Sequence, residues 1–173
     1  GYVRHYMMDF GTIMGSGGRG PQPPYRGYEN EIDPHEILKK IFTLGLWVDE
    51  WEKPDTVLHS SIGRVDPVDM HPENFKFIFP NPAFDNCTNL DAYWGAKLVT
   101  SFTDEQIEAI ISTGDYPTDA AQYATDVLIS RRDIIGRYWF NKVNPLDHFS
   151  VTNKGSNFSL KFDDLSVDMG YEM

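Results

Sequence analysis

The sequence predicts an α+β fold that is mainly helical, with a strand near the start and a short antiparallel β tail at the end. Two patterns predict it. Apolar residues recur at the three- and four-residue spacing of helices over the middle of the chain. Residues 2–8, 149–152 and 158–162 alternate instead, as strands do. The 173 residues suit one domain with an appendage, so we expect a body at 1–148 and a strand tail at 149–173.

The first 30 residues predict a strand followed by a long loop. Residues 2–8 are rich in aromatic side chains and end at Asp9-Phe10-Gly11. Residues 15–27 are rich in glycine and proline, but they lack the Gly-Lys-Ser/Thr ending of a phosphate-binding loop. We therefore interpret them as an irregular loop.

The first helix is expected to begin at Asp33-Pro34-His35-Glu36, which combines an acidic cap with a proline in the first turn. Gly45 is expected to end it. Its apolar face would be formed by Ile37, Leu38, Ile41, Phe42 and Leu44. Residues 46–90 are proline-rich and aromatic, and we expect a long ordered connection there.

Three further helices are expected. The first begins at Asp91, and the second follows the capping box Thr103–Gln106 and ends at Gly114. The third and longest runs from Thr118 to about Val143. Its expected inward positions are Tyr123, Val127, Leu128, Ile135, Tyr138 and Trp139.

The tail predicts two strands around the turn 153–156, and residues 163–168 are expected to form a third extended piece. Two or three strands alone are marginally stable. We therefore expect the tail to pair with the body, with the remainder of a longer parent chain, or with another protein.

Charge and composition exclude several classes of function. The net charge is −11, so no basic face is available for phosphates and nucleic-acid binding is disfavoured. No apolar run approaches the roughly 18 residues of a membrane span, so we expect no transmembrane segment. The single cysteine, Cys87, excludes an intrachain disulfide, and we expect it to be a packed thiol.

The candidate chemical site is Asp9-Phe10-Gly11 at the end of the first strand. This pattern resembles the magnesium-binding motif of protein kinases, in which the Asp holds the metal ion against nucleotide phosphates. On that interpretation Asp9 is a metal ligand, Phe10 packs beneath it and Gly11 lets the backbone turn. The alternative is a strand-ending turn whose Asp caps a backbone amide.

More of the chain resembles the C-terminal region of a family of uncharacterised bacterial proteins with an Asp-Phe-Gly-Ser/Thr-x-x-Gly-Ser motif. The family is itself similar to divergent, atypical protein kinases. The segments that carry the resemblance lie between residues 4 and 149: Asp9–Gly17, Ser61–Val65, Phe79–Phe84, Ala92–Lys97, Phe102–Ile107, Arg131–Arg137 and Asn144–Asp147.

The resemblance implies that residues 1–148 are part of a kinase-like C-terminal lobe, and that the parent protein is longer, bacterial and exported. It also implies magnesium and ATP as cofactors of that parent. Of the metal ligands, only Asp9 carries over to this sequence, and Mg²⁺ needs about six oxygen ligands. We therefore expect no catalytic residue and no bound cofactor in this chain alone, and phosphoryl transfer only in the full-length protein.

A second function class remains open beside the kinase-like one. It is a non-catalytic structural or interaction module, such as a pseudokinase or a cell-envelope assembly protein, that uses the strand tail to bind partners. A hydrolase is a distant third, because no serine-nucleophile motif is present.

Arg131, Arg132 and Arg137 share one predicted helix, and we interpret them as clamps to the acidic connection rather than an anion site. Asp133 is spaced to pair with Arg137.

Overall fold

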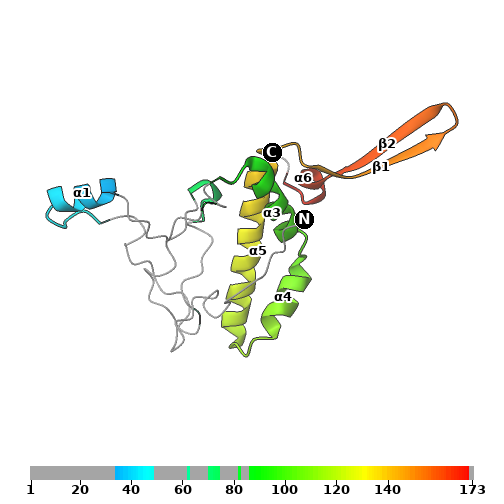
Figure 1. The fold of residues 1–173 in the computed structure, drawn as a ribbon. Coiled ribbons are helices and arrows are strands. Elements are labelled where there is room, and N and C mark those ends of the chain that lie inside the picture. Colours follow the sequence, from blue (N-terminus) through cyan, green and yellow to red (C-terminus); the bar gives the residue numbers. More distant parts are fainter. Residues whose placement is uncertain (1–33, 49–61, 63–69, 75–81, 83–85, 172–173) are drawn as a thin grey trace.

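The computed structural model describes residues 34–48, 62, 70–74, 82 and 86–171. These residues form a mainly helical body from which a β hairpin projects near the C-terminal end, so the predicted α+β class is confirmed (Figure 1). The predicted first strand and glycine-rich loop lie outside the described residues. The elements are α1 (Pro34–Phe42), η2 (Pro72–Asn74), α3 (Asn89–Thr100), α4 (Asp104–Ser112), α5 (Thr118–Phe140), β1 (Leu146–Lys154), β2 (Asn157–Asp164) and α6 (Leu165–Asp168).

Helix α1 ends close to the predicted glycine. The Gly45 amide donates to the Lys40 carbonyl at 2.8 Å, and the Leu44 amide donates to the Ile41 carbonyl at 3.1 Å. This pair of bonds is the Schellman motif, which places a residue in the left-handed region just after the helix. Here Leu44 (φ +52°) and Gly45 (φ +79°) both adopt that conformation. The predicted apolar side chains of α1 are exposed.

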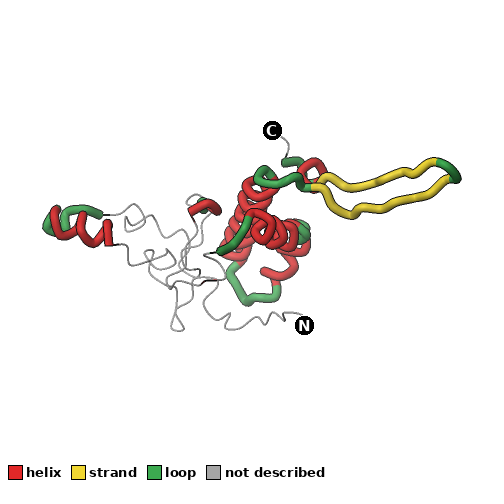
Figure 2. Tube along the Cα trace, turned by 45° about the horizontal axis from the view of Figure 1, so that its top comes forward, coloured by secondary structure: helices red, strands yellow, loops and turns green. Residues whose placement is uncertain are grey.

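Helices α3, α4 and α5 form the centre of the body, and α5 contacts both of the others (Figure 2). One core cluster joins Ile111 of α4 to Ala120, Ala124 and Val127 of α5. Ile62 completes it and is only 2% exposed, so one residue of the predicted connection is buried in the core. The two alanines are small enough for the neighbouring elements to approach the helix closely.

Paired caps fix where α3 and α4 begin. The Thr103 hydroxyl accepts a hydrogen bond from the Gln106 amide, and the Gln106 side chain accepts one from the Thr103 amide, which confirms the predicted capping box. Thr88 and Asp91 exchange the same pair of hydrogen bonds at α3. This helix begins at Asn89, two residues before its predicted start.

Helix α5 is three residues shorter than predicted. It ends at Phe140, which is 1% exposed, because the chain must leave the helix before Pro145 and turn into β1. Of the predicted inward positions, Val127 is buried and the others are half-buried. All of the half-buried ones except Tyr138 pack against one of the two core clusters.

The chain returns to α5 after the hairpin. A second core cluster joins Ala96 of α3, Phe140 of α5 and Tyr171. The prediction of a third extended piece at 163–168 is wrong for residues 165–168, which form α6, whereas residues 163 and 164 belong to β2. Asp164 caps this short helix: its carboxylate accepts hydrogen bonds from the Ser166 and Val167 amides.

The hairpin confirms the two predicted strands and extends them. β1 and β2 pair antiparallel, and Gly155 in the turn between them has a φ of +72°. A bulge interrupts the register between Asp147 and Ser150, and His148 there has a φ of +52°. The hairpin contacts the described body at its base, where β2 meets α6.

Candidate functional site

The predicted metal ligand Asp9 and its neighbours Phe10 and Gly11 lie outside the described residues, so the magnesium interpretation stays a prediction. Within the described ranges, no group of three or more histidine, cysteine, aspartate or glutamate side chains could hold a metal ion. No helix of that same part of the chain is long and apolar enough to cross a membrane.

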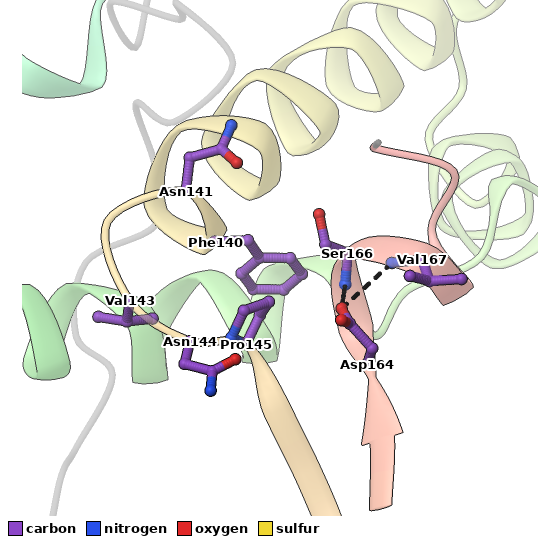
Figure 3. A pocket seen from close by; sticks show the side chains of 8 residues that line it. All are labelled: Phe140, Asn141, Val143, Asn144, Pro145, Asp164, Ser166 and Val167. Carbon is purple, nitrogen blue, oxygen red and sulfur yellow. Dashed lines mark hydrogen bonds between the residues drawn. The ribbon is translucent and has the colours of Figure 1, made fainter. Parts of the chain in front are cut away.

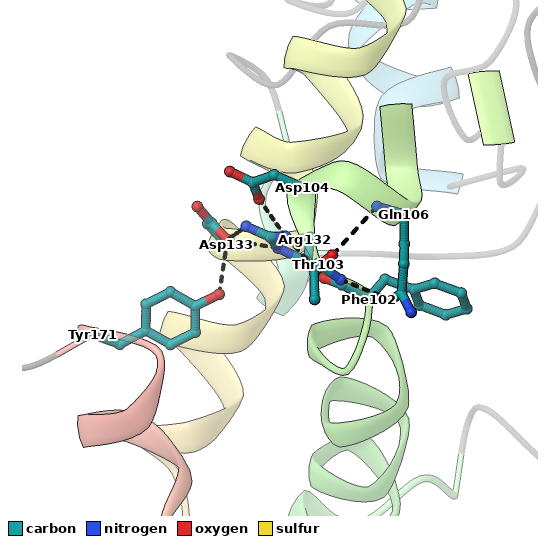
Figure 4. Close-up of polar contacts among 7 residues, drawn as sticks. All are labelled: Phe102, Thr103, Asp104, Gln106, Arg132, Asp133 and Tyr171. Atoms are coloured by element: carbon teal, nitrogen blue, oxygen red, sulfur yellow. Dashed lines mark hydrogen bonds and ion pairs between the residues drawn. The ribbon is translucent and has the colours of Figure 1, made fainter. Parts of the chain in front are cut away.

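A polar cluster around Arg132 is the most buried charged feature of the described chain (Figure 4). Arg132 donates from Nη1 to the Phe102 carbonyl at 2.9 Å and to Asp104 Oδ1 at 2.7 Å. Its Nε donates to Asp133 Oδ1 at 2.9 Å, and the Tyr171 hydroxyl donates to the same oxygen at 2.8 Å. The cluster thus connects the start of α4, the middle of α5 and the C-terminal segment.

The electrostatics of this cluster fit a structural clamp. Burial opposes the positive charge of Arg132, but the hydrogen bonds to Asp133 and Asp104 outweigh it and raise the pKa of the guanidinium. Burial, aided by the hydrogen bond to Asp133, raises the pKa of the Tyr171 hydroxyl. Because its donors already face a carbonyl and two carboxylates, Arg132 is poorly suited to capture a free anion.

Most of the acidic connection lies outside the described residues, so the predicted clamp of the arginines to it stays a prediction. The contacts of Arg132 are with the start of α4 and with its neighbour Asp133 on α5, rather than with the described residues of the connection. The guanidinium of Arg137 lies 4.9 Å over the Tyr171 ring, whereas Asp133 contacts Arg132 and Tyr171. Asp133 and Arg137 were expected to pair with each other, but both contact Tyr171 instead.

An open recess of about 450 Å³ lies between the end of α5 with its following turn, the end of β2 and α6 (Figure 3). Its lining combines apolar and amide side chains with one carboxylate, that of Asp164. That carboxylate accepts amide hydrogen bonds from Ser166 and Val167 at 3.0 and 3.3 Å, so it is committed to capping α6. Among the described lining residues, this capping carboxylate is the one acidic or basic side chain. The recess is lined by Phe140, Asn141, Val143, Asn144, Pro145, Asp164, Ser166 and Val167.

The hairpin is apolar on one side and polar on the other. Val151 lies opposite Leu160, and Asn153 lies opposite Phe158, so these four side chains share one face. The Phe149 and Phe162 rings belong to the same face and lie 5.9 Å apart. We call the apolar members the hairpin face: Phe149, Val151, Phe158, Leu160 and Phe162, each between 47% and 73% exposed.

The opposite side of the hairpin is polar. Ser150 lies opposite Lys161, and Thr152 lies opposite Ser159. A strand that is apolar on one side and polar on the other is typical of a sheet with one buried face. A two-stranded sheet is marginal by itself, so the hairpin face is the candidate docking surface of the described chain.

Ionic contacts fix the base of the hairpin. Asp147 and Asp163 lie directly opposite each other, an unfavourable pairing of like charges. Lys97 of α3 donates to Asp147 at 2.5 Å, and this hydrogen bond raises the pKa of Lys97 and lowers that of Asp147. His148 Nδ1 lies 2.8 Å from Asp163 Oδ2. Each carboxylate of the pair thus has a basic partner.

The sequence mispredicts the environment of Cys87 and does not identify Tyr171. The expectation that Cys87 is a packed thiol is wrong: it is exposed, immediately before the Thr88 cap of α3. Tyr171, which joins the polar cluster to a core cluster, was not singled out by the sequence, because a lone aromatic near the end of a chain carries no periodic signal.

Comparisons of the chain with protein-family models, with curated proteins and with solved structures found no match. The chain's own residues therefore carry the functional inference.

Proposed function

We propose that this chain acts as a non-catalytic interaction module that docks a partner polypeptide against the hairpin face. The observation that carries the proposal is the separation of the two sides of the hairpin. Five apolar side chains are exposed on one side, and serine, threonine and lysine occupy the other. A partner that covers the apolar side would remove it from water, which is the main favourable term in protein association.

The charged residues of the body support this proposal by their arrangement. Arg132 is held by a carbonyl and two carboxylates, and Asp164 is held by two backbone amides. Groups fixed in this way stabilise the body. The projecting hairpin, like α1, keeps apolar side chains exposed, and in the hairpin they are gathered on one side of a two-stranded sheet.

A photo-cross-linking experiment tests the docking function. A photoreactive phenylalanine analogue placed at Phe158 lies on the hairpin face, and the same analogue at Ser159 lies one residue away on the polar side. In the source cells, we expect discrete protein adducts from position 158 and few from position 159. Adducts of equal yield from both positions, or none from position 158, would refute docking through this face.

A second candidate function is magnesium-dependent phosphoryl transfer by a longer parent protein. The strand pattern that ends at Asp9-Phe10-Gly11 favours it, and Asp9 would then be the metal ligand. A single carboxylate does not satisfy the coordination of Mg²⁺, so the other ligands would have to come from the rest of that parent.

A calorimetric titration tests the part of this candidate that concerns the present chain. We expect Mg-ATP to bind more weakly than about 100 µM, which corresponds to roughly −5.5 kcal/mol. Tighter binding that Asp9→Asn abolishes would show that the chain holds the nucleotide without the parent, and would replace the docking proposal with an enzymatic one.

A further inference from the structure

We infer that the partner of the hairpin face is a second copy of the same chain, with the two hairpins packed face to face around a twofold axis. This inference rests on the proposed docking function and adds the identity of the partner. The two β1–β2 hairpins would form a small four-stranded sandwich with their apolar sides inward.

Self-complementarity is the first argument. Between Phe149 and Phe162, Asn153 is the one polar side chain of the described hairpin that lies on the apolar side, and no charged residue lies there. The next residue of β2 on this side is Asp164 at the base of the hairpin, where it caps α6. A twofold pair brings like against like, and an uncharged apolar surface allows that without electrostatic repulsion. A strand added to either edge of the hairpin would leave this side in water, so packing face to face covers it better.

The area of the face is the second argument. The exposed fractions of Phe149, Val151, Phe158, Leu160 and Phe162 average about three-fifths, which corresponds to about 500 Å² of accessible surface per copy. A symmetric pair would bury about 1,000 Å² in total, which reaches the lower limit of specific interfaces. We therefore expect a dimer of moderate affinity, with a dissociation constant in the micromolar range.

Charge is the third argument. The whole chain carries −11, but residues 149–162 contain two lysines and no acidic residue. Strands of eight or nine residues reach about 26 Å from the body, which exceeds the Debye length of about 8 Å at physiological salt. The hairpin can thus join two copies while their acidic bodies stay far enough apart to be screened from each other.

Sedimentation velocity of the full chain from about 1 to 300 µM tests the inference. We expect the weight-average mass to rise from 19.8 kDa toward twice that value as concentration increases. Leu160→Lys places a charge on the hairpin face and should raise the dissociation constant by about tenfold or more. Ser159→Lys adds the same charge to the polar side of the hairpin, so this variant should dimerise with the dissociation constant of the wild-type chain. Circular dichroism of both variants verifies that they fold.

A wild-type chain that stays monomeric over this range would overturn the second-copy inference. So would a dimer that Leu160→Lys leaves intact, or one that both lysine variants weaken equally. The docking proposal is judged separately: adducts to a different protein from position 158, with a monomeric purified chain, would support docking and exclude self-association. Binding of the monomer to phosphatidylserine vesicles, lost in Leu160→Lys, would assign the face to a membrane and also overturn the inference.

Discussion

Alanine should destabilise the protein at Gly136, near the C-terminal end of α5, and stabilise it at Gly95 in α3. A Cβ added at Gly136 would lie 2.4 Å from Tyr171 Cε2 and 2.7 Å from Thr100 Cγ2, so both neighbours would have to move. A Cβ added at Gly95 meets nothing within 4 Å. Both residues lie inside helices, where alanine is favoured over glycine by about 1 kcal/mol.

The expected net effects follow from these distances. At Gly95 the helical preference acts alone, so Gly95→Ala should raise the free energy of unfolding by about 0.5–1 kcal/mol. At Gly136 overpacking costs about 1–3 kcal/mol, and displacement of Tyr171 weakens its hydroxyl bond to Asp133, which contributes about 1 kcal/mol. The helical preference offsets about 1 kcal/mol of this loss, so we expect Gly136→Ala to lower the free energy of unfolding by about 1–3 kcal/mol.

Urea unfolding followed by far-ultraviolet circular dichroism measures both variants under one condition. A loss of about 1–3 kcal/mol corresponds to a lower melting temperature by about 2–12 °C for a chain of this size. In a Tyr171→Ala background, Gly136→Ala should cost less, because the closest contact has been removed. If the two variants have the same free energy of unfolding, then Tyr171 does not pack against α5, and the second core cluster is not formed as described.

Three further changes test the cap, the clamp and the hairpin base. Thr103→Ala should lower the free energy of unfolding by about 1 kcal/mol in a urea titration, whereas Thr103→Ser should keep most of the capping contribution. Arg132→Lys cannot bridge a carbonyl and two carboxylates, so we expect a loss of about 2 kcal/mol, and near-native stability would contradict the clamp. Lys97→Met should lower the melting temperature at pH 7. Because the pair lowers the pKa of Asp147, its contribution is present above the ordinary value of 3.8 and is lost as pH falls through the lowered pKa. The difference between Lys97→Met and the wild type should therefore vanish near pH 2, and a difference independent of pH would refute the ionic origin.

The parts of the fold that the sequence predicted well are those determined by local chemistry. A capping box acts within four residues, so Thr103–Gln106 located the start of α4 correctly. Alternation over residues 149–162 located both strands of the hairpin and their apolar side. The glycine after α1 ended that helix through bonds to its own last turn.

The features that were missed depend on contacts between distant segments. Ala120 and Ala124 are fully buried because α5 is approached closely there, and a small side chain gives no sequence signal for that position. Arg132 was recognised as a clamp, but its partner Asp104 lies 28 residues away, a distance that no local pattern spans. The extended piece expected at 163–168 failed over residues 165–168 for a local reason, since the Asp164 side chain stabilises a helical turn instead.

Periodicity identifies an apolar face but does not say what covers it, and α1, α5 and the hairpin show the difference. The apolar side chains of α5 pack against α3 and α4, while those of α1 and of the hairpin are exposed. About 500 Å² of exposed apolar surface on the hairpin corresponds to roughly 12 kcal/mol of transfer free energy if it were buried, which is similar to the whole stability of a typical domain. A two-stranded sheet that gains that contribution becomes stable, and one that does not stays marginal. Association and the ordering of the hairpin should therefore be coupled, so that amide hydrogen exchange in β1 and β2 slows as the protein concentration increases while exchange in α5 does not.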